Sequence, residues 1–431
     1  MGNNIKILVN ECLQCKNPTC IEGCPAHNNI PLFIKLCKEE KYQEALNVIK
    51  QTSTLPSICS LVCPSENQCQ GHCIKNKINK PVQVSKIEQF ITLNSIETNN
   101  EIINNGHNVA IIGSGPASLA CAEKLRVLGY KVDVYDKYHT PGGILTYGIP
   151  EFVLDKKIVN KKIDYLKSID VNFIMNKEYN KDISLEYLCS NYDAIFLGFG
   201  ASIGKKMEAK NNNIKGIVDA NEFLLNMYEK NDKHYINCKN ILVIGGGNTA
   251  IDAARVAKRK LNSNVTIVYR RSENEMPARK VEISKAKEDG INFYFLANPI
   301  AYHGEKSVFD VECIKMRLEK VDGDRARPVV IENSNFIIKA DLVIEAISSS
   351  IDSSLTNDLA THSWGGIVVN ENQQTSIDKV FAGGDCSQGP SLVVKAMKDG
   401  IKAAESIDKF IKKWHIMCHF FIIVRFRRFL I

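Results

Sequence analysis

The sequence lacks any run of 18 or more apolar residues, so no segment has the length and polarity of a membrane-spanning helix. Its first ten residues, MGNNIKILVN, also lack the long apolar stretch of a secretory signal peptide. Fifteen cysteines without an export signal are typical of reduced thiols and metal sites rather than of disulfides. We therefore expect a cytoplasmic protein without a membrane segment.

Basic charge is scarce in the body of the chain, although the formal net charge is +7. Five cations and no acid fall in residues 412–431, so the residues before them are nearly neutral. No basic stripe is present that could neutralise nucleic-acid phosphates, and we predict no nucleic-acid partner.

The sequence also lacks a Ser/His/Asp or metal-hydrolase grouping, because its nine histidines are dispersed. Redox chemistry carried by a bound cofactor needs no such residue.

Cysteine is concentrated near the N-terminus, where nine of the fifteen lie between Cys12 and Cys73. Eight of these nine form two groups, Cys12-x2-Cys15-x4-Cys20-x3-Cys24-Pro25 and Cys59-x3-Cys63-Pro64-x4-Cys69-x3-Cys73, and the ninth, Cys37, is expected in the core. Short spacings let one loop wrap several thiolates around one centre, and the Cys-Pro ending resembles a ferredoxin run whose last cysteine serves another cluster. The pattern favours two four-iron (4Fe-4S) clusters. Two tetrahedral zinc sites, which would need the same ligands, are the main alternative.

The residue pattern of the chain changes at Asn108. The preceding module has apolar residues at helical spacing over 33–52 and is predicted to be helical, with a polar linker after it. Seven later runs are predicted as buried parallel strands: VAIIG, KVDVYD, AIFLGFG, NILVIGGG, VTIVYRR, DLVIEAI and KVFAGGD. Their alternation with helical segments predicts doubly wound α/β domains.

A dinucleotide-binding turn follows the first of these strands, in VAIIGSGPASLACAEKL. Gly113 permits a tight turn, and Gly115 lets the backbone approach a pyrophosphate. The helix that opens at Pro116 and Ala117 presents its N-terminus to that group. Asp136 ends the next strand, where a carboxylate can bind ribose hydroxyls. This unit is therefore predicted to bind a dinucleotide.

A second copy, ILVIGGGNTAIDAARVA, has its turn and helix start at Gly245, Gly247, Asn248 and Thr249. Its second strand ends in Arg270 and Arg271, where an acid would otherwise face a 2′-hydroxyl. Two guanidinium groups suit a 2′-phosphate, which predicts NADPH rather than NADH. The alternative is an ordinary basic strand end.

Together these motifs resemble the small (β) subunit family of glutamate synthase. That family is similar to the FAD/NADPH/iron–sulfur half of dihydropyrimidine dehydrogenase and to the large subunit of NADH-dependent ferredoxin:NADP oxidoreductase. The resemblance covers about residues 11–412, and its most specific pieces are ECLQCKNPTCIEGCP, ICSLVCPSENQC, GSGPAS, PGGILTYGIPEF, GGGNTAIDAARVA, VYRRSENEMPA and FAGGDCSQGPSLVVKAM.

The resemblance implies a helical two-cluster iron–sulfur domain followed by two Rossmann-type domains of the glutathione-reductase kind. The implied domains are 1–104 for the clusters, 107–225 with 340–412 for FAD, and 226–339 for NADPH. The tail at 413–431 matches nothing in the family. Further FAD contacts are implied at Gly143, Gly384 and Asp385.

The resemblance also implies that the cluster ligands interleave. One cluster would take Cys12, Cys15, Cys20 and Cys73. The other would take Cys24, Cys63, Cys69 and a side chain from a later helix. The matching segment, VSKIEQF, puts Glu88 in that place and Gln89 as the fallback. Cys59 would then be a neighbour rather than a ligand.

The implied activity is the transfer of electrons from NADPH through FAD and two 4Fe-4S clusters to a partner subunit, as in the small subunit of glutamate synthase. Within the same class, the alternatives are a dihydropyrimidine dehydrogenase subunit and a ferredoxin- or sulfide-linked NAD(P) oxidoreductase. A zinc-stapled interaction protein without enzymatic activity is the alternative from another class.

Overall fold

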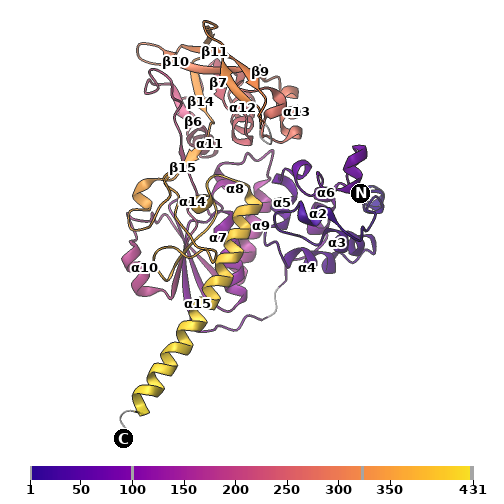
Figure 1. The fold of residues 1–431 in the computed structure, drawn as a ribbon, viewed down its shortest axis with the longest axis vertical. Coiled ribbons are helices and arrows are strands. Elements are labelled where there is room, and N and C mark those ends of the chain that lie inside the picture. The colour runs from indigo at the N-terminus through magenta and orange to yellow at the C-terminus, as the bar shows by residue number, and fades with distance from the viewer. Residues whose placement is uncertain (1, 99–100, 322–324, 428–431) are drawn as a thin grey trace. The chain divides into compact units, whose positions relative to one another are not determined.

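The computed structural model describes residues 2–98, 101–321 and 325–427 (Figure 1). The chain forms two compact units. Unit 1 contains Met1–Thr146, Glu151–Ala201 and Ile351–Ile431, and unit 2 contains Tyr147–Pro150 and Ser202–Ser350.

These units differ from the domain division expected from the sequence. Residues 202–225 and 340–350 belong to unit 2, whereas the sequence assigned them to the split FAD-binding domain. The reason is a strand pairing: β6 (Ile217–Asp219) hydrogen-bonds β14 (Leu342–Glu345), and β14 in turn pairs with β7 (Asn240–Ile244) in the sheet of unit 2.

The N-terminal part of unit 1 is helical, which confirms that part of the fold prediction. It contains α1 (Gly2–Asn10), α2 (Thr19–Glu22), α3 (Ile30–Lys38), α4 (Tyr42–Lys50), α5 (Pro56–Val62) and α6 (Val84–Leu93), with short 3₁₀ turns η1 (Ser65–Asn67) and η2 (Ile74–Ile78). The Asn29 side chain caps α3 by accepting the backbone N–H of Leu32. Apolar faces of α3, α4 and α6 meet in a core in which Phe33, Ile49 and Ile87 are fully buried.

The α/β part of unit 1 is a five-stranded parallel sheet in the order β16-β4-β1-β2-β3. Its strands are β1 (Asn108–Ile112), β2 (Lys131–Asp136), β3 (Val171–Met175), β4 (Ala194–Leu197) and β16 (Val380–Ala382). Its helices are α7 (Pro116–Val127), α8 (Ile144–Tyr147), α9 (Lys156–Ser168), α10 (Leu185–Asn191), α14 (Asp385–Gln388) and α15 (Val393–Arg427), with η4 at Ser353–Leu355. Because β16 joins from the far end of the sequence, the residues after Ile351 complete this sheet.

Unit 2 contains a second parallel sheet in the order β6-β14-β7-β8-β9. Its further strands are β8 (Asn264–Tyr269) and β9 (Asn292–Phe295), and its helices are α11 (Ala220–Tyr228), α12 (Asn248–Leu261) and α13 (Lys280–Glu288), with η3 at Glu273–Glu275. A separate antiparallel sheet contains β10 (Ala297–His303), β11 (Asp310–Glu319), β12 (Arg327–Val330) and β13 (Phe336–Lys339). A two-stranded ribbon pairs β5 (Ile203–Gly204) with β15 (Ser349–Ser350). Two parallel sheets, one in each unit, confirm the predicted α/β class.

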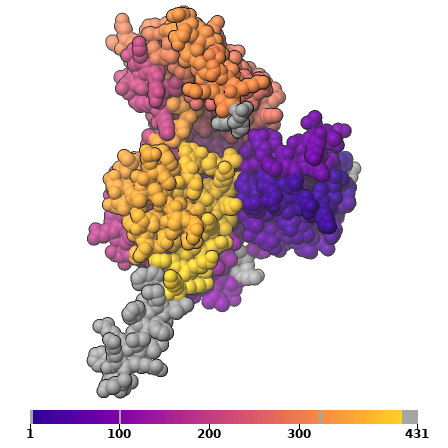
Figure 2. All heavy atoms as spheres, in the orientation of Figure 1, coloured from indigo at the N-terminus to yellow at the C-terminus, as the bar shows by residue number. Residues whose placement is uncertain are grey.

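Helix α15 packs along α7 and reaches back to the helical part of unit 1. The Ser53 hydroxyl, just before α5, lies 3.3 Å from the sulfur of Met397 on α15. In the space-filling view the N-terminal part, indigo to purple, lies directly against the yellow residues near 400 (Figure 2). Of the tail predicted at 413–431, α15 contains the residues up to Arg427, and residues 428–431 lie outside the described part. None of the helices in the described ranges has the length and the apolar character needed to cross a membrane.

Candidate functional site

The first expected set of cluster ligands lines one cavity. Cys12, Cys15, Cys20 and Cys73 all contribute to its wall. Thr19 on α2 donates its hydroxyl hydrogen to the backbone oxygen of His72 at 2.5 Å, and this bond holds Cys73 beside the earlier cysteines. Gln14 Nε2 donates to Cys12 Sγ at 3.4 Å, as an amide does toward a thiolate.

The second expected set also gathers in the structure. The negative charges of Glu88, Cys24 and Cys63 add to burial in raising the pKa of the Cys69 thiol, so the four groups lie within electrostatic reach of one another. Glu88 lies on α6 and is buried, and its Oε1 atom accepts no hydrogen bond. A buried carboxylate oxygen without a donor is costly unless a cation faces it.

The chemistry of both sets fits a bound metal centre. Burial raises the pKa of Cys20 to about 11, with the charges of Cys12 and Cys73 adding to it, and burial raises the pKa of Glu88 to about 8. A coordinated metal reverses such shifts, because it deprotonates its thiol ligands. Among the residues that the structure describes, no three His, Cys, Asp or Glu side chains are close enough to share one metal ion.

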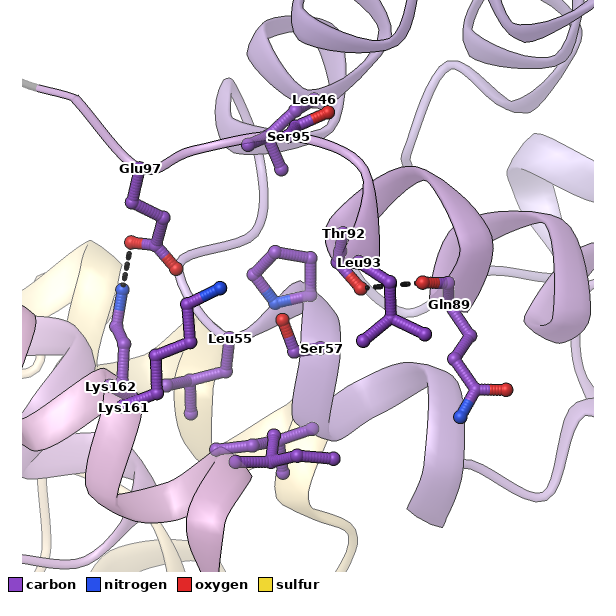
Figure 3. A pocket seen from close by; sticks show the side chains of 13 residues that line it. Leu46, Leu55, Ser57, Gln89, Thr92, Leu93, Ser95, Glu97, Lys161 and Lys162 are labelled. Atoms are coloured by element: carbon purple, nitrogen blue, oxygen red, sulfur yellow. Dashed lines mark hydrogen bonds and ion pairs between the residues drawn. The ribbon is translucent and has the colours of Figure 1, made fainter.

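The prediction also named one neighbour of the ligands, Cys59, and one fallback ligand, Gln89. Cys59 is buried on α5 and does not line the cavity of the first set. Gln89, the fallback ligand, lines a different pocket, between α6 and α9 (Figure 3). The carboxylate of Glu88 is therefore the better candidate for the eighth ligand.

The first dinucleotide turn is formed by β1, a glycine turn and the N-terminus of α7. Gly113 has φ +87°, and a Cβ there would lie 2.6 Å from the backbone oxygen of Gly198, so only glycine fits. A Cβ at Gly115 would meet no atom within 4 Å. This open space lies in front of the N-terminus of α7, where Pro116 and Ala117 begin the helix, and it fits a pyrophosphate.

Asp136 at the end of β2 already takes part in this turn. Its Oδ2 accepts the backbone N–H of Ser114 at 2.8 Å and the Ser114 hydroxyl at 2.6 Å, and its Oδ1 accepts the N–H of Tyr138 at 2.9 Å. A carboxylate has about four acceptor positions, so at least one stays available for a ribose hydroxyl.

The other expected FAD contacts converge on the same turn. A Cβ at Gly143 would lie 2.9 Å from the Cα of Gly115, and a Cβ at Gly384 would lie 3.0 Å from the Cβ of Ala117. Burial raises the pKa of the neighbouring Asp385 to about 6. Sequence reasoning missed Asp399 on α15, whose Oδ2 accepts the N–H of Gly384 at 3.0 Å; only the folded chain brings these residues together.

The second dinucleotide turn lies in unit 2, between β7 and α12. Gly245 has φ +144°, and a Cβ there would overlap the backbone oxygen of Ala346. A Cβ at Gly247 would enter open space at the start of α12, which begins with Asn248 and Thr249. Asn248 Oδ1 accepts the backbone N–H of Arg279 at 2.9 Å, so this side chain also fixes the loop before α13.

Arg270 and Arg271 follow β8, which pairs with β7 beside this turn. Arg270 is exposed. Arg271 Nε donates to the backbone oxygen of Ala326 at 2.9 Å, which leaves its two terminal nitrogens for another acceptor.

Two protein families match the chain. The family described as pyridine nucleotide-disulphide oxidoreductase matches residues 107–400. The family described as dihydropyrimidine dehydrogenase domain II, 4Fe-4S cluster, matches residues 5–100. The boundary between the two matches agrees with the change in residue pattern near residue 108.

The chain is also similar to several bacterial proteins. It is 34% identical to the glutamate synthase (NADPH) small chain of Escherichia coli K12, over 93% of this chain and 90% of that one. It is 36% identical to AegA of E. coli K12 over 92% of this chain, but it spans only 64% of that longer protein. Among solved structures, FprA of Mycobacterium tuberculosis in complex with NADPH has a TM-score of 0.64 at 17% identity, covering 72% of this chain and 86% of FprA.

Proposed function

Because the chain belongs to the pyridine nucleotide-disulphide oxidoreductase family, together with the small chain of NADPH glutamate synthase, we propose that it carries electrons from NADPH to a partner protein. The observation that supports this proposal is that the expected ligands of each cluster lie near one another in the folded chain. Each set takes members from both halves of the N-terminal module, and both lie in the same unit as the first dinucleotide turn.

Each part of the chain has its own task in this proposal. The turn from Gly113 to Ala117 would hold the FAD pyrophosphate, with Asp136, Gly143, Gly384 and Asp385 around it. The turn from Gly245 to Thr249, with Arg270 and Arg271, would hold NADPH. The first set of cysteines would hold one 4Fe-4S cluster, and Cys24, Cys63, Cys69 and Glu88 would hold the other.

When bound, FAD supplies chemistry that no side chain of this protein offers, since it takes a hydride from NADPH and releases electrons singly to the clusters. The chain positions the groups and excludes water. The buried strand β4, the buried residues Val109–Ile112 of β1 and the closely packed glycines around Gly113 surround the first turn.

The partner is proposed to dock where the first set of cysteines lies near the surface. Leu13 and Ile78 are each 64% exposed and Ile74 is 51% exposed, which is unusual for such large apolar side chains. The exposed lysines of this patch are Lys16, Lys77 and Lys80. An apolar centre with a cationic rim favours a partner face that is apolar with an acidic rim.

The proposed partner is an acceptor of the glutamate synthase large-subunit type, because the small chains of that enzyme match this sequence over nearly their full length. A dihydropyrimidine dehydrogenase-type or ferredoxin- or sulfide-linked acceptor is the second candidate, favoured by the match of residues 5–100. The proposed location is the cytoplasm, where thiols stay reduced.

The experiment is anaerobic purification of the full chain, followed by its visible spectrum and its flavin, iron and inorganic sulfide contents. The proposal expects flavin and iron–sulfur absorption that NADPH bleaches. A colourless protein that contains zinc would instead favour a non-enzymatic, zinc-stapled protein. Capture of a glutamate synthase large subunit by the full chain from native extract would distinguish the two acceptors.

A further inference from the structure

Four charged side chains form a closed ring in unit 1. Lys162 Nζ lies 2.5 Å from Glu123 Oε2 and 2.9 Å from Glu97 Oε2. Lys50 Nζ lies 3.2 Å from Glu123 Oε1 and 3.4 Å from Glu97 Oε2. Each lysine therefore contacts both glutamates. The side chains of Lys162 and Glu123 are only 5% and 4% exposed, so the ring is closed to water on that side.

One aromatic ring supports both cations. The Nζ atoms of Lys50 and Lys162 lie 4.7 and 4.6 Å from the centre of the Tyr165 ring. Lys50 also donates to the Tyr165 hydroxyl at 3.1 Å. Figure 3 shows the Lys162–Glu97 pair at the edge of the pocket between the helical part and α9.

The members of the ring come from both parts of unit 1. Lys50 is the last residue of α4, and Glu97 follows α6, the helix that carries Glu88. Glu123 lies on α7, whose first residues form the dinucleotide turn, and Lys162 lies on α9. The ring therefore links the cluster-bearing helices to the helix that begins at the flavin turn.

The charges in the ring are held in place by one another. Burial opposes the charge of Lys162, yet Glu123 and Glu97 raise the pKa of its ammonium group above the usual value. Burial likewise opposes the charge of Glu97, yet Lys162 and Lys50 lower its pKa below the usual value. Both groups are therefore charged at neutral pH.

Such a ring contributes little to the net free energy of unfolding, because the cost of taking charges out of water nearly cancels their attraction. Apolar packing is the larger stabilising contribution in unit 1, as where α5 contacts α15, the helix on which Met397 is fully buried. The ring instead specifies how the helices are oriented, since all four ion pairs can form together only when the helices are in this arrangement.

We propose that this ring is a positioning element that fixes α6, and with it the cluster of Cys24, Cys63, Cys69 and Glu88, against α7 and α9. It thereby sets the rate at which single electrons pass from the flavin, which is oxidised, to that cluster, which is reduced, with NADPH as the source of the electron pair. This inference rests on the proposed function. Lys162 and Glu123 touch neither cofactor in this account and act only through the helices that they join.

The test uses the full chain with the double substitution Lys162→Met and Glu123→Gln, which removes one cation and one anion and leaves Lys50 and Glu97 balanced. Lys161→Met is the matched control, because Lys161 is the exposed neighbour of Lys162 on the same helix. Three quantities are measured: hydrogen exchange of residues 84–98, the rate of flavin reduction by NADPH, and the following rate of cluster reduction.

The double variant is expected to exchange faster over 84–98, to keep its rate of flavin reduction, and to reduce its cluster several-fold more slowly, because the rate of single-electron transfer falls steeply as the distance between donor and acceptor grows. Lys161→Met is expected to match the unmodified protein in all three. If the double variant does not fold, Glu97→Gln, which keeps the side-chain shape and removes one charge, replaces it with the same expectations.

Unchanged cluster reduction, or a parallel loss of flavin reduction and iron content, would overturn the proposal, because the ring would then have no role or a purely structural one. Absence of flavin and iron from the unmodified chain would defeat the proposed function instead. The exchange measurement would still decide whether the ring fixes α6.

Discussion

Asp399 Oδ2 accepts the backbone N–H of Gly384 at 3.0 Å, so a carboxylate on α15 fixes the turn that presents Asp385. Gly384 has φ +77°, a conformation that favours glycine, and the hydrogen bond holds it there. Asp385 itself is bonded to the N–H of Ser391 at 3.1 Å. Two carboxylates thus lie side by side at the expected flavin site.

This pair predicts a pH dependence of FAD binding. Burial raises the pKa of Asp385 to about 6, with the charge of Asp399 adding to it, so the carboxyl is ionised above about pH 6 and protonated below. We expect the ionised form to be the better acceptor for a flavin hydroxyl. The dissociation constant for FAD should therefore rise as the pH falls through 6, by roughly tenfold. Titration of the apoprotein with FAD at several pH values measures this.

Asp385→Asn is the control for that titration, because the amide cannot ionise. It should bind FAD more weakly at neutral pH and show no step near pH 6. A step that persists in Asp385→Asn would assign the titration to another group.

The arginines after β8 predict the choice of nicotinamide cofactor. Replacing both Arg270 and Arg271 by alanine should raise KM for NADPH by roughly 100-fold or more, since each charge-assisted hydrogen bond to a phosphate contributes about 1.5–3 kcal/mol and two are lost. KM for NADH should change little. Arg317→Ala is a suitable control, because Arg317 is an exposed arginine of the same unit that pairs with Glu319. An NADPH preference that survives the double substitution would show that the 2′-phosphate is bound elsewhere.

Much of the fold could be predicted from the sequence, because its buried strands are strongly apolar. All seven predicted strands exist, as β1, β2, β4, β7, β8, β14 and β16. The prediction did not include β3, β6 or β9. Residues of β9 are alternately exposed and half-buried, and β6 has only three residues, so neither has the continuous apolar pattern of a central strand. The antiparallel sheet from β10 to β13 was missed for the same reason.

Contacts between residues far apart in the sequence were harder to predict than the dinucleotide turns. Gly113 and Gly115 are recognisable because a local motif defines them. Glu97 and Lys162 are not, because nothing near either residue in the sequence indicates that they meet. The domain boundary expected at residue 225 also depended on a contact between distant parts of the sequence. Residues 202–225 belong to unit 2 because β6 pairs with β14.

The proposed docking patch predicts a loss of partner reduction without a loss of flavin chemistry. Ile78→Asp with Lys77→Glu should weaken partner binding by about tenfold or more, because the change adds negative charge to a face that favours an acidic partner. Reduction of a small dye by NADPH should stay normal. The control is Ile103→Asp, at an apolar residue that is 83% exposed in the linker. Equal loss in both variants would argue against this patch.

In the proposed arrangement each cluster takes ligands from both cysteine groups, and iron content tests this arrangement most directly. The measurement is iron and inorganic sulfide per chain in Cys59→Ala and Cys73→Ala, each purified without oxygen and checked for folding by its flavin content. Cys59→Ala should keep both clusters, whereas Cys73→Ala should lose about half of the iron, because only Cys73 is a ligand. Loss of a cluster in Cys59→Ala, whatever the iron content of Cys73→Ala, would contradict the interleaved arrangement, because a self-contained second group would need both cysteines.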